Sequence, residues 1–226
     1  MATKSIVGAS GRCLLVVSVA LFGLAACGKQ GAANTSAPLA TADSKDDPGK
    51  KCFFVVGALS DVDAELFSAS GAGDVRRVQQ AIDAGANANA ADSLQRTPLF
   101  ASAFCNQAQA AGLLLDKGGS VDARDFTGMA SLHAAIIAGS RDVASLLMAR
   151  GANVNLQSNS GRTPLHLAAA TDQPALVALL LDRGVNARLR DQNGLTAASL
   201  AANNGNAKVA ATIKGWLGKQ QAVTRK

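Results

Sequence analysis

The side chains that could carry chemistry are two histidines and four cysteines in a chain of 226 residues. The histidines, His133 and His166, lie 33 residues apart, and each directly follows a leucine. An acid–base or metal site needs unlike groups that converge on one point, whereas two identical side chains in the same local context indicate a repeated structural task. We therefore expect each ring to hydrogen-bond loop backbone and to bridge two neighbouring units.

Sequence signatures of catalysis and of ligand binding are missing. There is no serine nucleophile elbow and no Cys/His cluster with metal-ligand spacing, and Gly71-Ala72-Gly73 lacks the third glycine and the preceding strand of a dinucleotide-binding loop. The sequence therefore predicts a protein without enzymatic activity, cofactor or metal ion.

The first cysteine, Cys13, opens an apolar run that ends at Ala26 and follows a short basic region ending at Arg12. The run is too short to span a bilayer, which needs about 20 apolar residues, so it predicts a secretion signal. Leu24-Ala25-Ala26-Cys27 resembles the lipobox of bacterial lipoproteins. The resemblance implies that residues 1–26 are a cleaved signal peptide and that Cys27 carries acyl chains such as palmitate; an ordinary signal with a coincidental cysteine is the alternative.

The residue after the lipobox bears on location. Gly28 resembles the outer-membrane sorting signal of Gram-negative bacteria, so we expect a lipid-anchored protein of the cell envelope, on the outer membrane and facing the periplasm; the inner membrane is the other possible site. Residues 27–59 are mostly small and polar, which predicts a flexible tether, except for the apolar strip at 53–56.

Two cysteines remain for the mature protein, Cys52 and Cys105. An even pair in an oxidising compartment predicts a disulfide, which would close a loop of about 50 residues and contribute about 4 kcal/mol. Free, buried thiols are the alternative.

The formal net charge of +6 does not predict nucleic-acid binding. Lys4 and Arg12 lie in the leader, and residues 60–206 contain 11 Lys and Arg against 13 Asp and Glu. The excess positive charge follows Asp191, in residues 208–226. Because no basic stripe is interleaved with aromatic residues, we expect solvated lysines on a terminal helix and no nucleic-acid partner.

A period of 33 residues organises most of the chain after residue 60. Glycine recurs at 85, 118, 151 and 184, Thr-Pro-Leu occurs at 97–99 and 163–165, and a third register contains residues 73, 106, 139, 172 and 205. Such self-similarity is typical of stacked repeats. At 131–155 and 158–191 the chain resembles the ankyrin-repeat family. The resemblance implies an all-α solenoid of helix-turn-helix units joined by β-hairpin-like loops, over residues 60–218.

Local chemistry within the unit agrees with that fold. Thr163 can cap a helix and Pro164 suits its first position; a second helix is expected from Ala175 to Arg183, and Gly184 can take the left-handed conformation that ends it. We expect five repeats followed by a basic tail at 219–226. The repeats are 61–91, 92–124, 125–157, 158–190 and 191–218.

In the ankyrin family, the side chains that meet partners lie on the hairpin tips and on the exposed side of the first helices. Carried over by register, the expected partner-binding face combines apolar side chains with arginines and glutamines: Leu94, Arg96, Phe104, Arg124, Phe126, Met129, Ile137, Gln157, Arg162, Arg190 and Gln192. This composition is typical of a protein interface. Alternatively, the 53–56 strip covers the apolar patch and the interface lies nearer to 162–195.

The function predicted from these features is a monomeric, membrane-tethered periplasmic module that binds an unidentified partner protein. It would act as an inhibitor or immunity protein, or as an accessory to an exported enzyme, and the sequence does not favour one of these roles. A structural envelope protein and an enzyme with a site between repeats are the alternatives.

Overall fold

The computed structural model describes residue 57 and residues 59–224, within one compact unit, Ser44–Lys226. The predicted signal peptide, Cys27 and the tether up to residue 56 lie outside the described residues. Ten helices form in the described part: α1 (Asp61–Ala72), α2 (Val75–Asp83), α3 (Pro98–Phe104), α4 (Ala108–Asp116), α5 (Ser131–Ile137), α6 (Arg141–Ala149), α7 (Pro164–Ala170), α8 (Pro174–Asp182), α9 (Ala197–Asn203) and α10 (Ala207–Thr224). The predicted all-α solenoid is confirmed.

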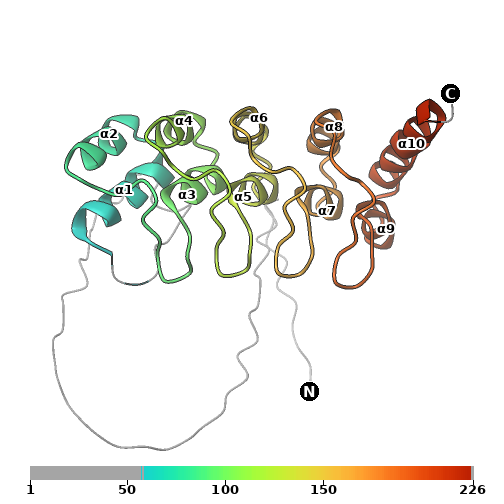
Figure 1. Ribbon diagram of the computed structural model, residues 1–226, viewed down its shortest axis with the longest axis horizontal. Helices are drawn as coiled ribbons and strands as arrows, with labels where there is room; N and C mark the ends of the chain where they lie inside the picture. The colour runs from blue at the N-terminus through green and yellow to red at the C-terminus, as the bar shows by residue number, and fades with distance from the viewer. Residues whose placement is uncertain (1–56, 58, 225–226) are drawn as a thin grey trace, which may run out of the picture. The chain divides into compact units, whose positions relative to one another are not determined.

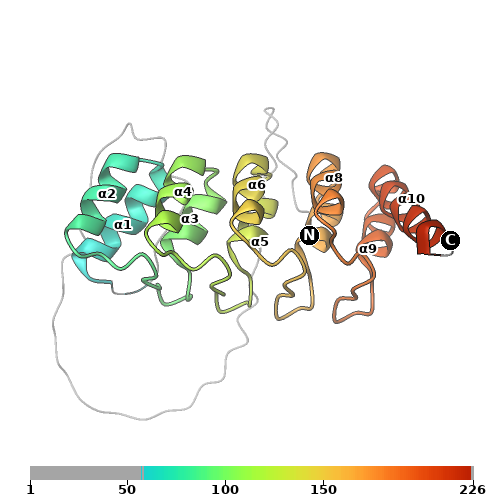
Figure 2. The same ribbon diagram turned by 45° about the horizontal axis from the view of Figure 1, so that its top comes forward.

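The helices lie in two rows (Figure 1). The first helices of the repeats, α1, α3, α5, α7 and α9, stand side by side, and the second helices form a row above them. Long loops after α2, α4, α6 and α8 project below the first row. Because each helix pair is too small to bury its own apolar face, stacking on the neighbouring pairs supplies the core; Figure 2 shows the same stacking from a second direction.

Core side chains recur at the repeat period. In the first row Leu66, Leu99, Leu132 and Leu165 are at most 1% exposed, and in the second row Leu114, Leu147, Leu180 and Ile213 are fully buried. Buried alanines fill the space between helices of adjacent repeats. The small side chains let the helices approach closely, which explains an apolar content rich in alanine.

The first helices begin at the predicted caps. The Oγ1 atoms of Thr97, Thr163 and Thr196 accept hydrogen bonds from the backbone N–H three residues later. Pro98 and Pro164 occupy the first turn, where a missing N–H leaves no bond unmade. α5 begins after an alanine, which offers no capping oxygen.

The second helices end at the predicted glycines. Gly85, Gly118, Gly151 and Gly184 have φ values of 95°, 85°, 88° and 74°, in the left-handed region that favours glycine. α8 begins and ends one residue earlier than expected, because Pro174 takes the first turn and Arg183 is its C-cap.

The last helix is longer than the repeat predicts. In register with the four terminating glycines stands Leu217, so no left-handed residue ends α10 there, and the helix continues past Gly218 to Thr224. The expected basic tail at 219–226 is therefore helical up to residue 224. Across the part of the chain that the structure describes, no helix combines the length and apolar character needed to cross a membrane.

Candidate partner-binding surface

The four loops that project below the first row have a common construction. We call residues 92–96, 125–129, 158–162 and 191–195 the fingers. In each, the N–H of the first residue donates to the carbonyl of the fifth, with N···O distances of 2.8 to 3.0 Å. The fingers therefore close as the β-hairpin-like loops that were expected.

An aspartate organises three of the fingers. The Oδ1 atoms of Asp92, Asp125 and Asp191 each accept from the backbone N–H groups two and four residues later, at 2.8 to 3.0 Å. In the remaining finger Ser158 accepts from the N–H of Arg162 at 3.3 Å. This role was not predicted from the sequence, although the aspartates recur at the same 33-residue register as the histidines.

Neighbouring fingers are tied to each other. The backbone N–H of Phe126 donates to the carbonyl of Leu94 (3.0 Å), that of Asn159 to Thr127 (2.8 Å), and that of Gln192 to Ser160 (3.0 Å). Side-chain amides strengthen the row, since Asn159 Nδ2 donates to the carbonyl of Phe126 at 2.9 Å. The tips thus form one preformed surface, which loses little conformational entropy when a partner docks.

Both histidines have the structural role predicted for them. In His133, Nδ1 accepts from the backbone N–H of Ala130 at 3.1 Å, and Nε2 lies 3.3 Å from the carbonyl of Arg162 in the next repeat. His166 repeats the pattern with Thr163 (3.2 Å) and Leu195 (3.1 Å). A neutral ring with its proton on Nε2 satisfies all four contacts.

The protonation of these rings follows from their burial. Removal from water lowers the pKa of His133 and of His166 below the ordinary value of 6.5, against smaller opposing effects of the backbone hydrogen bonds. Within the described residues no three His, Cys, Asp or Glu side chains gather in a way that could hold a metal ion.

The apolar part of the face is exposed. Phe126 is 56% exposed, and Phe104 and Ile137, which occupy equivalent positions at the ends of α3 and α5, are 37% and 39% exposed. Phe126 and Met129 line a hollow of about 380 Å³ together with Thr127 and with residues 158–160 of the next finger. The predicted residues Phe126 and Met129 therefore come together beside a polar wall.

Comparison with known families agrees with this geometry. A family model described as ankyrin repeats (3 copies) matches residues 66–158 and 150–215. The chain belongs to the ankyrin-repeat family. A search of the curated proteins found no match. Ankyrin repeats indicate a protein–protein interaction module, and the family is typically a non-enzymatic interaction scaffold.

Several polar side chains predicted to face a partner also form hydrogen bonds within and between the ankyrin fingers. Gln157 Nε2 donates to the carbonyls of Gly161 (2.7 Å) and Arg190 (2.9 Å), and the guanidinium of Arg124 donates to the carbonyl of Gln157. Arg190 Nη1 donates to Gly194 at 2.6 Å. These hydrogen bonds stabilise the loops, while Arg124 and Arg190 remain exposed.

The remaining predicted polar residues are held in the same way. Gln192 Nε2 donates to the carbonyl of Asn159 at 2.5 Å, and half-buried Arg96 pairs with Asp92, with 2.8 Å between Nε and Oδ2. Leu94, which lies between Asp92 and Arg96 in the sequence, is half-buried. Arginine and glutamine side chains at ankyrin tips thus shape the surface before any partner arrives.

Arg162 has a special position among the arginines. Its Nε lies 3.9 Å from Oδ2 of Asp191 in the next finger, a buried oxygen without a hydrogen-bond partner in the structure. The guanidinium is therefore the cation that faces this buried carboxylate, and a replacement of reversed charge would leave two carboxylates side by side.

Cys105 is the C-cap of α3. Cys52, its expected partner, and the 53–56 strip lie outside the described residues. The pairing, and the alternative in which the strip covers the apolar patch, therefore stay predictions.

Proposed function

We propose that this ankyrin-repeat protein is anchored to the outer membrane by lipid on Cys27 and binds one partner protein in the periplasm through its fingers and the exposed ends of α3 and α5. The single observation that supports the docking site is Phe126, a large apolar side chain that is more than half exposed on a loop held by hydrogen bonds to its neighbour. Exposure of this kind is typical of an interface anchor.

The chemistry around Phe126 supports contact with a protein surface. The neighbouring hollow has an apolar side formed by Phe126 and Met129 and a polar side formed by Ser158, Asn159 and Ser160. An apolar partner side chain fits against the first, and hydrogen-bonding groups of the partner meet the second. Because the fingers are already fixed to one another, the binding free energy is not spent on ordering them.

Ile137 extends the same face. It lies at the end of α5 and is 39% exposed, at the register position that Phe104 occupies on α3. Docking at this face serves either role expected from the sequence, since an inhibitor occludes its target and an accessory protein positions an exported enzyme through the same binding step.

Paired substitutions test the docking site. Phe126→Asp and Ile137→Asp place a charge on the exposed apolar face, whereas Ala175→Asp adds the same charge to an exposed position of α8 in the other row. Crosslinked capture from bacterial membranes followed by mass spectrometry is expected to lose its stoichiometric partner with the first two variants and to keep it with the third. Equal capture by all three proteins would refute the docking site.

The anchor has a separate test. Cys27→Ser is expected to abolish incorporation of labelled palmitate and to release the protein from the membrane fraction. A Cys27→Ser protein that remains labelled and membrane-bound would disprove the lipoprotein proposal while leaving the docking site in place.

A further inference from the structure

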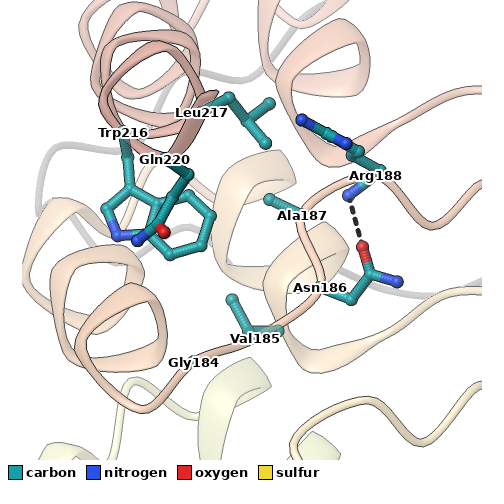
Figure 3. A pocket seen from close by; sticks show the side chains of 8 residues that line it. All are labelled: Gly184, Val185, Asn186, Ala187, Arg188, Trp216, Leu217 and Gln220. Carbon is teal, nitrogen blue, oxygen red and sulfur yellow. Dashed lines mark hydrogen bonds between the residues drawn. The ribbon is translucent and has the colours of Figure 1, made fainter. Parts of the chain in front are cut away.

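The C-terminal end of the solenoid has a second concave surface. Because α10 continues past the repeat register, Trp216, Leu217 and Gln220 project from it toward the loop 184–188 that follows α8 (Figure 3). Together these residues line a hollow of about 390 Å³. None of them belongs to the fingers.

The floor of this end hollow is apolar. Val185 and Ala187 are 1% and 2% exposed, and Trp216 and Leu217 are half-buried against the core. On its other side, Trp216 borders a hollow of about 340 Å³ between α8 and α10, lined also by Leu181 and Lys219. The indole is therefore shared by two adjoining concavities, each of a size that suits small ligands and single side chains.

The chain segment 182–220, which supplies the lining of the end hollow, carries more cations than acids. Exposed cations between residues 183 and 219 are Arg183, Arg188, Arg190, Lys208, Lys214 and Lys219, whereas the acids between residues 182 and 219 are Asp182 and the buried Asp191. Arg188 lines the hollow, and its backbone N–H is held by Asn186 Oδ1 at 3.1 Å. Among the described residues, no carboxylate forms an ion pair with its guanidinium.

We propose that the end hollow is a second binding site, beyond the finger surface, for a polypeptide segment that carries a bulky apolar side chain next to acidic residues. The apolar side chain packs against Trp216, Val185 and Leu217, and a neighbouring carboxylate pairs with Arg188. Charge complementarity selects an acidic segment, since Arg188 is the one charged side chain that lines this hollow.

The shape of the site favours a polypeptide over an anionic membrane. A helix that binds a bilayer surface projects large apolar side chains into the lipid. On α10, by contrast, Trp216 is turned toward the loop that carries Val185 and Ala187, and the exposed positions among residues 207–220 are lysines and small or polar residues. The flat surface of a lipid bilayer does not reach the buried floor of the hollow, whereas a single side chain of a polypeptide does.

Fluorescence of the protein itself reads this site directly. Trp216 is the one tryptophan in the sequence, so the emission of the full-length protein reports on the end hollow. The probes are eight-residue peptides with a central Phe or Leu flanked by Glu and Asp, and matched peptides with Gln and Asn at those positions. Acidic peptides are expected to give a saturable emission shift, and the amide peptides to bind about tenfold more weakly. No saturable shift, or equal affinity for both sets, overturns the proposal.

Two matched charge reversals distinguish binding in the end hollow from nonspecific attraction to the positive charge of the C-terminal region. Arg188→Glu alters a lining residue, and Arg183→Glu makes the same change at an exposed position just outside the hollow. Arg188→Glu is expected to weaken acidic-peptide binding about tenfold, and Arg183→Glu by no more than about twofold. Equal losses would contradict a site at Arg188. An emission shift with phosphatidylglycerol vesicles that exceeds the shift with every peptide would identify a membrane as the occupant and overturn the proposal.

The proposal is independent of the finger surface. Phe126→Asp is expected to leave peptide-induced emission shifts unchanged, because Phe126 lines neither of the hollows beside Trp216. Loss of the emission shift in the Phe126→Asp protein would contradict a separate second site.

Discussion

Nε2 of His133 lies 3.3 Å from the main-chain carbonyl oxygen of Arg162, 29 residues along the chain. The bond fastens the first helix of one repeat to the finger of the next, and the side chain of the same Arg162 faces Asp191 one finger further on. Three consecutive repeats are therefore coupled through Arg162, which links the stability of the solenoid to the shape of its binding surface.

Truncation of the buried ring is expected to destabilise the protein. His133→Ala leaves a cavity and two backbone groups without their partner, so the free energy of unfolding should fall by about 3 kcal/mol in urea titrations. Ser199→Ala removes the hydroxyl group of a half-buried side chain at the equivalent position of the last repeat and should lose less than about 1 kcal/mol. Similar losses for the two variants would mean that the histidine bridge contributes little.

Acidification is expected to destabilise the protein through both histidines. Their pKa values are lower in the folded protein than the ordinary 6.5, chiefly because burial disfavours the charged ring. The unfolded chain therefore binds more protons in this range, and stability that is complete above pH 6.5 is lost as the pH falls through the lowered pKa values. Urea midpoints measured from neutral to mildly acidic pH should decline, and the double variant His133→Gln/His166→Gln should flatten that decline. An equal slope in the double variant would rule out the histidines as the cause.

Substitution of two glycines that have nearly the same backbone conformation distinguishes two causes of lost stability. One cause is backbone strain, and the other is a steric contact between neighbouring fingers. Gly161 and Gly194 have φ values of 75° and 73°, but a Cβ on Gly161 would lie 2.8 Å from the backbone N of Gln192, whereas a Cβ on Gly194 meets nothing within 4 Å. Each change to alanine should lose about 1 kcal/mol from backbone strain.

At position 161 the contact between the new Cβ and the backbone of Gln192 destabilises the protein further. Gly161→Ala should lose about 1 to 3 kcal/mol more than Gly194→Ala, because the fingers must move apart. Thermal and urea unfolding of both variants measure the difference. Identical stabilities would show that the fingers separate without loss of free energy.

The finger that lacks an aspartate offers a stabilising substitution. Ser158 and Arg162 occupy the positions of Asp92 and Arg96. Asp92 forms an ion pair with Arg96 and accepts the backbone N–H groups of the loop, whereas, among the backbone groups of its own loop, Ser158 accepts only from the N–H of Arg162. Ser158→Asp should therefore raise the free energy of unfolding by about 1 kcal/mol. Ser158→Asn supplies a similar acceptor without the charge, so an equal gain would assign the effect to the loop hydrogen bonds alone. A loss of stability with Ser158→Asp would contradict the equivalence of the two fingers.

The repeat register made most of the fold predictable. Caps such as Thr163, terminators such as Gly184 and the bridging histidines depend on a few neighbouring residues and on the spacing of 33, and the sequence displays both. The extra length of α10 is also consistent with the register, because Leu217 stands where the other repeats have a terminating glycine.

The finger surface was less predictable. The exposure of Phe126 follows from its place at a tip, whereas the hydrogen bonds of Arg124 and Gln157 to loop carbonyls do not follow from the sequence. A long polar side chain can either extend into solvent or hydrogen-bond to a nearby carbonyl group. The carbonyl groups of the neighbouring finger come within reach only after the repeats have stacked, so the sequence of one repeat does not predict which alternative occurs. The buried partner of Arg162 is likewise a product of stacking, since Asp191 belongs to the next repeat.

Site-specific photocrosslinking tests the central claim most directly. A photoreactive phenylalanine analogue at Phe126 or at Ile137 places the reactive group on the finger face, and the same analogue at exposed Ala149 of α6 places it in the other row of helices. In intact cells the first two positions are expected to yield the same discrete crosslinked protein and Ala149 to yield none. No crosslinked protein at Phe126 and Ile137, or the same product from all three positions, would contradict a protein-binding function of this face.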